Sequence, residues 1–271
     1  MKFYDLIKQQ KMVIGMVHTL ASPGAPKNNC SVPEIVQRAV QEAKIYAEAG
    51  LDAIIIENMH DVPYQRRAVG PEVVSTLTAV ALAIKAAVRL PVGLQILAGA
   101  NRQAMAVALA ADLDFIRAEG FVFSHVADEG LMDSDAAELL RYRRMIGAEA
   151  VKIFCDIKKK HSSHALTNDL KISEFAAAAD FFLADGLIVT GSSTAAAAKL
   201  ADVQDVKNAS KNPVLIGSGL TDQNIQEYWN EADGFIIGSY FKTAGYWENA
   251  IDPQRLQNLM LQVSQLRRQN K

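Results

Sequence analysis

Short apolar runs alternate with longer stretches of helical pattern along the whole chain. Continuous apolar runs are typical of parallel strands that are covered on both faces. Strict alternation of strands and helices predicts an α/β protein with a parallel sheet, and eight such units in 271 residues favour closure into a (β/α)8 TIM barrel. We expect a single domain over residues 1–271, with strands at 12–17, 51–56, 92–97, 115–116, 151–157, 186–190, 214–216 and 235–237.

Residue types that begin and end helices mark the segments between these runs. Ser31 and Glu34 form a capping-box pattern that opens a helix, and Gly50 follows its expected end. Side-chain caps for later helices are expected at Asn101, Ser173 and Thr221. Further helices are expected at 72–88, 134–147, 194–209 and 253–266. No G-x-G-x-x-G follows the first run, which argues against an open dinucleotide-binding sheet.

Side chains alternate between the two faces of a strand, so periodicity predicts which of them enter the barrel. In the fifth run, Phe154 and Asp156 share a mixed face while the alternate positions are uniformly apolar, so the mixed face is expected to point inward. The same rule turns Gln95 of the third run and Arg117 and Glu119 of the fourth inward. These polar groups should meet at the carboxyl ends of the strands, where barrels of this kind carry their active sites.

The candidate site residues follow the ends of the first six runs. Burying so many polar groups would be costly without a function or mutual pairing. An alternative is that Arg117 pairs with Glu119 or Asp156 in an ion-pair network that only closes the top of the barrel. The candidates for catalysis are His18, Glu57, Arg117, Glu119, Asp156, Lys158 and His161, and the candidates for substrate binding here are Asn58, Gln95, Thr190 and Gly191.

The chemistry of these side chains suggests separate roles. The three carboxylates are candidate general acids or bases, and the two histidines are further proton carriers. Arg117 would stabilise developing negative charge. Lys158 could neutralise a phosphate or, if desolvated, form a Schiff base. His161 and His164 could hold a divalent metal together with Asp156, but a lone H-x-x-H is a weak pattern, and we expect no metal or other cofactor.

A Gly-Ser pair ends each of the last two runs. Glycines at such positions let a ligand approach the backbone closely. The loops after strands seven and eight are also the usual phosphate site of a (β/α)8 barrel. The alternative is that glycine after a strand is ordinary turn punctuation. The expected phosphate-binding residues are Gly217, Ser218, Gly219, Gly238 and Ser239.

Composition narrows the range of partners. The formal net charge is −2 with the signs interspersed, so no nucleic-acid surface is indicated. Cys30 and Cys155 make no disulfide framework, which favours a reducing compartment. The start lacks the apolar core of a signal peptide and no apolar run approaches the ~18 residues of a membrane span, so we expect a cytoplasmic location. The aromatic residues within 240–247 could pack internally, or form an exposed patch or a homo-oligomer interface.

Several ordered motifs are shared with one known family. They are G-M-V-H (15–18), I-I-E-N (55–58), D-V-P-Y (61–64), F-I-R (115–117), D-E-G (128–130), D-I-K-K-K-H (156–161), D-G-L-I-V-T-G (185–191), G-S-G-L-T (217–221) and D-G-F-I-I-G-S-Y-F-K (233–242). On these motifs the chain resembles the BtpA/SgcQ family over nearly its whole length. The resemblance implies a barrel of the phosphate-binding type. Family members are associated with photosystem I biogenesis or with sugar-metabolism genes.

Two functions follow as expectations. The first is an enzyme that acts on a small phosphorylated metabolite, a sugar phosphate or nucleotide-like compound, by acid–base chemistry at the carboxyl-terminal rim. Isomerase, lyase and hydrolase chemistry all remain open. The second is a non-catalytic factor for the biogenesis or stabilisation of a complex, with a vestigial pocket. Some family members have been labelled nucleoside triphosphatases, but no P-loop G-x-x-x-x-G-K-[S/T] occurs in this sequence.

Overall fold

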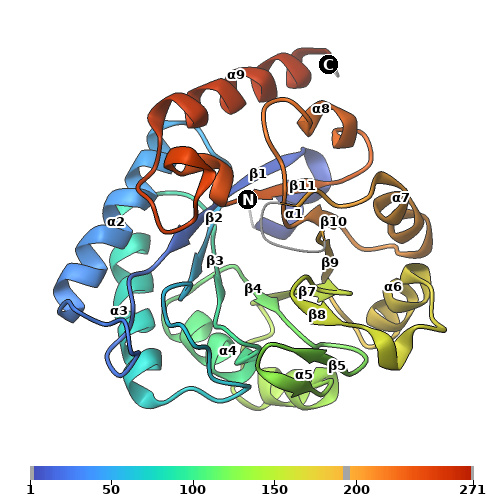
Figure 1. The fold of residues 1–271 in the computed structure, drawn as a ribbon, viewed down its shortest axis with the longest axis horizontal. Helices are drawn as coiled ribbons and strands as arrows, with labels where there is room; N and C mark the ends of the chain where they lie inside the picture. The colour runs from blue at the N-terminus through green and yellow to red at the C-terminus, as the bar shows by residue number, and fades with distance from the viewer. Residues whose placement is uncertain (1–2, 192–195, 270–271) are drawn as a thin grey trace.

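The structure is a computed structural model that describes residues 3–191 and 196–269. Within these residues, eight parallel strands close into a barrel in the order β1-β11-β10-β9-β7-β4-β3-β2 (Figure 1). They are β1 (Met12–His18), β2 (Ala53–Glu57), β3 (Val92–Gln95), β4 (Phe115–Ala118), β7 (Lys152–Ile157), β9 (Gly186–Val189), β10 (Val214–Ile216) and β11 (Gly234–Ile237). The prediction of a (β/α)8 barrel is confirmed.

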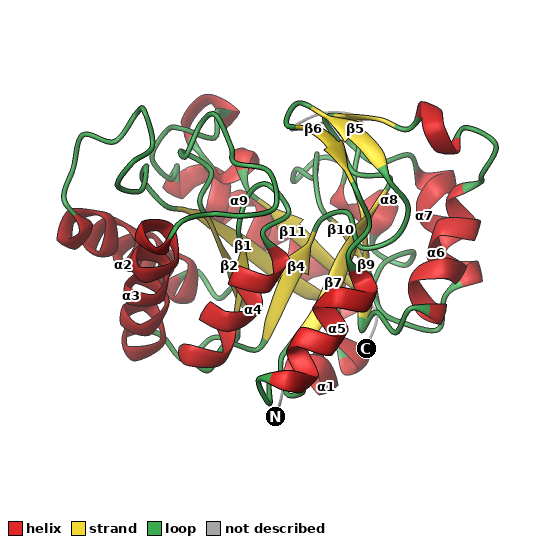
Figure 2. Cartoon of the chain, turned by 90° about the horizontal axis from the view of Figure 1, so that it is seen from below, coloured by secondary structure: helices red, strands yellow, loops and turns green. Residues whose placement is uncertain are grey.

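Helices surround the strands and cover the outer face of the barrel (Figures 1 and 2). They are α2 (Val32–Glu48), α3 (Pro71–Ala87), α4 (Asn101–Ala110), α5 (Ala136–Met145), α6 (Ile172–Phe181), α7 (Leu200–Ala209), α8 (Ile225–Tyr228) and α9 (Pro253–Gln269). The helix expected within 194–209 is described from Leu200, and positions 194 and 195 lie outside the described residues. Aliphatic side chains between strands and helices form the larger core.

A second core fills the barrel interior and is closed at its amino-terminal end by α1 (Phe3–Gln9). Phe3 stacks on Phe115 with a centroid distance of 4.2 Å, and Phe154 meets both rings edge-on. The predicted inward direction of Phe154 is thereby confirmed. Sequence analysis assigned no helix to this segment. The end of the barrel opposite α1 remains available for a site.

A small antiparallel sheet covers part of the carboxyl-terminal rim, opposite the amino terminus in Figure 2. Its strands, in spatial order, are β6 (Gly130–Met132), β5 (His125–Ala127) and β8 (Ser162–Ser163). Arg67 fastens the nearby loops, because its guanidinium donates to the carbonyls of Gly99, Glu119 and Gly120 and lies 2.8 Å from Asp135 Oδ2. The segment after β4 thus contributes two strands to this sheet. Short 3-10 turns follow β8 (η1, Ala165–Thr167) and β11 (η2, Ser239–Phe241; η3, Thr243–Gly245).

The capping box is confirmed and the predicted caps at Asn101 and Ser173 are wrong, whereas the Thr221 hydroxyl accepts the Gln223 N–H at 3.3 Å in the turn that leads into α8. The Ser31 N–H donates to the Glu34 carboxylate at 2.7 Å. Asn101 is instead the first residue of α4, and its amide donates to the Glu119 carbonyl and the Asp135 carboxylate across the fold. The helices expected to start at Ser173 and Thr221 begin after Lys171 and Asn224. The first residues of these helices are therefore set by contacts with other parts of the fold and not by the N-cap preference of the residue type alone.

Candidate functional site

A cavity of about 700 Å³ opens at the carboxyl ends of the barrel strands. Its walls come from both halves of the barrel and from Asp128 and Glu129 in the turn between β5 and β6. Eleven of the residues singled out from sequence line this cavity. They are His18, Glu57, Gln95, Arg117, Glu119, His161, Gly217, Ser218, Gly219, Gly238 and Ser239.

Arg117 and Asp156 form a buried bidentate ion pair at the floor of the cavity. Arg117 Nε lies 2.9 Å from Asp156 Oδ2, and Arg117 Nη2 lies 2.8 Å from Asp156 Oδ1. The Asp156 side chain is 0% exposed, so it reaches no ligand. Burial opposes the charge of Arg117, but Asp156 outweighs this effect and raises the pKa of the guanidinium above its ordinary value. Asp156, a predicted acid–base group, therefore positions Arg117, as in the ion-pair alternative.

His18 and Glu57 form a second buried pair, at the ends of β1 and β2. His18 Nδ1 lies 3.4 Å from the carbonyl oxygen of Trp247, and His18 Nε2 lies 3.5 Å from Glu57 Oε2. Burial, together with the charge of Lys242, lowers the pKa of His18 from 6.5 to about 3. Burial also raises the pKa of the Glu57 carboxyl, which Arg117 partly opposes.

These two shifts define how the pair can handle a proton. A neutral His18 that donates from Nδ1 to the Trp247 carbonyl presents the lone pair of Nε2 to Glu57 and to the cavity. A Glu57 carboxyl with a raised pKa can keep a proton near that nitrogen. The pair can therefore accept or deliver one proton at the cavity wall, which is the requirement for general acid–base catalysis.

The lowered pKa of His18 gives a pH prediction. His18 takes up a proton below about pH 6.5 in the unfolded chain, but only near pH 3 in the folded protein. Its contribution to the free energy of unfolding is therefore complete above pH 6.5 and is lost as the pH falls from 6.5 towards 3. We expect the imidazole NMR signals of His18, assigned by their absence in His18→Gln, to stay unchanged between pH 8 and pH 5. A titration of these signals with a midpoint near 6.5 would contradict the buried, neutral imidazole.

Three residues of the cavity wall carry a buried acceptor atom that lacks a hydrogen-bond partner among the described residues. The atoms are Gln95 Oε1, Glu119 Oε2 and Glu129 Oε2. The other carboxylate oxygen of Glu119 lies 3.3 Å from Lys159 Nζ, so the ion pair fixes the orientation of the group. Buried polar atoms are nearly always satisfied in folded proteins. The cavity wall therefore contains acceptors that no described residue satisfies.

The three consecutive lysines after β7 have separate fates. Lys158 Nζ donates to the Leu170 carbonyl at 2.6 Å and does not line the cavity, so the structure does not place this predicted site residue in the site. Lys159 and Lys160 both line the cavity. Sequence reasoning missed them because a loop has no side-chain period that would show which of three equal residues turns inward. The K-K-K run directly after a strand was the available signal.

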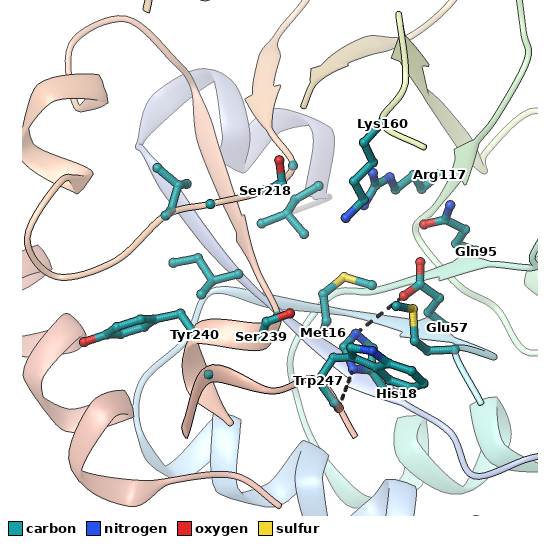
Figure 3. A pocket seen from close by; sticks show the side chains of 18 of the residues that line it. Met16, His18, Glu57, Gln95, Arg117, Lys160, Ser218, Ser239, Tyr240 and Trp247 are labelled. Atoms are coloured by element: carbon teal, nitrogen blue, oxygen red, sulfur yellow. Dashed lines mark hydrogen bonds and ion pairs between the residues drawn. The ribbon is translucent and has the colours of Figure 1, made fainter. Parts of the chain in front are cut away.

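The two Gly-Ser loops lie at different distances from the His18–Glu57 pair: Gly238 lies against the His18 ring, whereas Ser218 lies farther from it (Figure 3). Gly219 has φ +71, which favours glycine. The Ser218 hydroxyl accepts the Gly191 N–H at 2.8 Å and donates to the Ala196 carbonyl at 3.0 Å, so it ties two loops together. No described residue accepts a backbone hydrogen bond from the N–H of Gly219 or Ser239. The Ser218 hydroxyl is therefore used within the protein, whereas the N–H groups of Gly219 and Ser239, both in residues that line the cavity, have no described backbone acceptor.

Three further predicted binding residues support the cavity from outside. Asn58 donates to Asp61 Oδ2 at 2.9 Å and accepts the Leu97 N–H at 2.7 Å. Thr190 Oγ1 accepts the Lys160 N–H at 3.0 Å. Gly191, bonded to the Ser218 hydroxyl, is likewise absent from the cavity wall. All three fix loops whose neighbours line the cavity.

The residues of the metal alternative are not gathered around one point. Asp156 is paired with Arg117, and His164 Nε2 lies 3.0 Å from the Lys159 carbonyl oxygen. Within residues 3–191 and 196–269, no three His, Cys, Asp or Glu side chains are placed to hold a metal ion together. In the same ranges, no helix is long and apolar enough to cross a membrane.

Aromatic and apolar side chains line one side of the cavity. They include Met59, Tyr64, Leu97 and Trp247. Trp247 packs edge-on against His18 with a centroid distance of 6.2 Å. Phe241 is fully buried, so the aromatic residues of 240–247 do not form the continuous exposed patch that was one of the alternatives.

The fold and the cavity place the chain among the (β/α)8 barrels that carry a polar site at the carboxyl ends of their strands. Within that class, the chain belongs to the BtpA family, whose sequence pattern matches residues 9–265. It is 46% identical over 271 residues to an uncharacterised mitochondrial protein of Caenorhabditis elegans, covering 97% of this chain and 96% of that protein. It is 34% identical to the photosystem I biogenesis protein BtpA of Synechocystis, covering 94% and 89% of the two chains.

Solved structures with the same fold are more distant in sequence. Thiamine phosphate pyrophosphorylase from Pyrococcus furiosus matches with a TM-score of 0.58 at 14% identity, over 96% of this chain and 98% of that one. Orotidine 5'-monophosphate decarboxylase from Methanocaldococcus jannaschii, in complex with the inhibitor BMP, matches with a TM-score of 0.59 at 13% identity, over 93% and 98%. At these identities the likeness concerns the fold.

Proposed function

We propose that this protein is an enzyme that acts on a small phosphorylated metabolite by acid–base chemistry in the rim cavity. One observation carries the proposal. The cavity brings together backbone N–H groups of the last two βα loops that no described backbone group accepts, a buried proton-carrying pair, and buried acceptors without a described partner. A sugar phosphate or nucleotide-like compound supplies matching groups: phosphate oxygens for the N–H donors and hydroxyl or N–H groups for the acceptors.

The anchoring half of the site is the loop pair after β10 and β11. Backbone N–H groups at the ends of barrel strands seven and eight are a common phosphate cradle. The distant structural relatives include thiamine phosphate pyrophosphorylase and orotidine 5'-monophosphate decarboxylase, and each of these enzymes is named after a phosphorylated compound. This likeness supports the proposal as an analogy of fold. The N–H groups of Gly219 and Ser239 would hold the phosphate.

The reacting half of the site is formed by β1 to β4. His18 and Glu57 would exchange a proton with the substrate, and Arg117 would stabilise the negative charge that develops during this transfer. Gln95 and Glu119 would accept hydrogen bonds from the substrate and orient it. In this assignment, Asp156 holds Arg117 in place, and His161 in the loop after β7 is a further proton carrier. Isomerase, lyase and hydrolase reactions all use such a set.

A melting-temperature screen tests the proposal. Glycerol 3-phosphate, ribose 5-phosphate, dihydroxyacetone phosphate and AMP would each be compared with the unphosphorylated counterpart. We expect at least one phosphorylated compound to raise the melting temperature by several degrees while its counterpart does not, because a ligand that binds only the folded state stabilises it, by about 2.7 kcal/mol at 100 times the dissociation constant. Equal effects within every pair would contradict the proposal.

A non-catalytic role in assembling a complex is the second candidate. It is favoured by the name of the Synechocystis relative and by the exposed apolar side chains of Phe181 and Leu183, which are 81% and 67% exposed at the end of α6. This role predicts no stabilisation by any small molecule. The cytoplasmic location stays a prediction, and one close relative is a mitochondrial protein by name.

A further inference from the structure

Lys160 is a cavity lysine whose ammonium group is not engaged by any described residue. Its neighbours are engaged: Lys158 Nζ donates to the Leu170 carbonyl, and Lys159 Nζ pairs with Glu119. Lys160 Nζ has no such hydrogen bond or ion pair within the described residues. Figure 3 shows its side chain extending into the cavity beside Arg117. The three lysines therefore differ in availability although they are adjacent in sequence.

The backbone around Lys160 fixes the direction of this side chain. The Lys160 N–H donates to Thr190 Oγ1 at 3.0 Å, and the Ser162 hydroxyl donates to the Lys160 carbonyl at 3.3 Å. Lys158 and His161, on either side, have φ values of +46 and +54, in the left-handed region. Such conformations cost about 1–3 kcal/mol each and are found where surrounding contacts hold them. The loop is thus built to turn Lys160 toward the cavity.

The electrostatic surroundings favour the neutral amine. Burial lowers the pKa of Lys160, and the nearby charge of Arg117 lowers it further, which Glu57 and Asp156 only partly oppose. Arg117 keeps its charge because Asp156 holds it in a bidentate pair. A lysine that served only to attract a phosphate would work best as a permanent cation. A desolvated lysine beside a second cation is instead a typical amine nucleophile.

We propose that Lys160 forms an imine with a carbonyl carbon of the substrate, so that the substrate is a phosphorylated aldehyde or ketone such as an open-chain sugar phosphate. The inference rests on the proposed function and narrows its substrate class. The amine nitrogen bonds to the carbonyl carbon while the carbonyl π electrons move to oxygen; the oxygen takes up a proton and the nitrogen loses one, which gives a carbinolamine. The hydroxyl then leaves as water with one further proton, and the nitrogen loses its second proton, which leaves the C=N bond. The His18–Glu57 pair lies across the cavity to exchange these protons.

Borohydride trapping tests the imine directly. The full chain would be incubated separately with dihydroxyacetone phosphate, glyceraldehyde 3-phosphate and ribose 5-phosphate in the presence of sodium borohydride, and the reduced adduct located by peptide mass mapping. We expect one adduct per chain, on Lys160, with at least one of the three probes. Lys160→Gln should lose this adduct, and Lys158→Gln, a matched change outside the cavity, should retain it. Absence of an adduct with all three probes, or adducts scattered over surface lysines, overturns the proposal.

A parallel melting experiment separates this inference from the proposed function. Glycerol 3-phosphate has the phosphate but no carbonyl group, so it tests the anchor alone. We expect it to stabilise wild type and Lys160→Gln within a factor of about three in affinity, since the proposed phosphate donors are backbone N–H groups of Gly219 and Ser239. Stabilisation of both proteins without any trapped adduct would refute the imine and keep the phosphate site. Neither stabilisation nor adduct would refute both.

Discussion

Arg117→Ala should lower the free energy of unfolding by about 3–5 kcal/mol, because removal of one partner leaves a buried charge without compensation. Asp156 is fully shielded from solvent and has both carboxylate oxygens bonded to Arg117. Without the guanidinium, Asp156 must remain buried as an anion or take up a proton. Urea unfolding measures the change. The exposed Arg144, which pairs with Glu149 on the surface, is the control, and Arg144→Ala should leave stability essentially unchanged.

A double variant separates the structural role of this pair from its role in the site. Arg117→Met combined with Asp156→Leu removes both charges and keeps apolar volume, so it should recover most of the stability that Arg117→Ala loses. It should nevertheless fail to bind the phosphorylated compound that stabilises wild type. Recovery of both stability and binding would show that Arg117 only closes the barrel top, which was the alternative derived from sequence.

Gly219→Ala should weaken binding of a phosphorylated compound at least tenfold. Gly219 has φ +71, and a Cβ atom there would lie 2.2 Å from the Ala197 nitrogen, so the loop must move and carry its N–H away from the ligand. The loss is about 1.4 kcal/mol or more for a tenfold change. Isothermal titration of glycerol 3-phosphate measures it.

Gly238→Ala is the matched control for this change. Its Cβ would lie 3.3 Å from Met16 Cγ and 3.4 Å from His18 Nε2, contacts with side chains and not with backbone, and its φ is −116. We expect an effect on affinity that is clearly smaller than that of Gly219→Ala. Equal losses in the two variants would mean that the loop after β10 has no special part in holding the phosphate.

Strand alternation predicted the inward-facing residues correctly because a period of two is intrinsic to an extended strand. Gln95, Arg117 and Asp156 all point into the barrel as expected. The same reasoning did not show that both carboxylate oxygens of Asp156 would be bonded to Arg117. That outcome depends on β4 lying beside β7, with Arg117 opposite Phe154 in the register, which is a property of the closed barrel and not of either strand alone.

Loop residues were predicted less well, because a loop has no side-chain period and its contacts form only in the closed barrel. The rim sheet consists of strands of two or three residues, too short to show any periodicity. Ser218 was expected to hold phosphate with its hydroxyl, but that hydroxyl bonds Gly191 and Ala196 in a loop distant in sequence. Lys160 rather than Lys158 faces the cavity because two left-handed residues turn the loop. Such contacts arise only when the barrel brings separate loops together.

The location of a bound phosphate is the most direct test of the account. A crystal structure of the protein with glycerol 3-phosphate should show the phosphate within hydrogen-bond distance of the N–H groups of Gly219 and Ser239. Its glycerol hydroxyls should approach Gln95 Oε1 or Glu119 Oε2. A phosphate found only on the outer surface, or an empty cavity at saturating ligand, would contradict the assignment of this cavity as a phosphate-anchored active site.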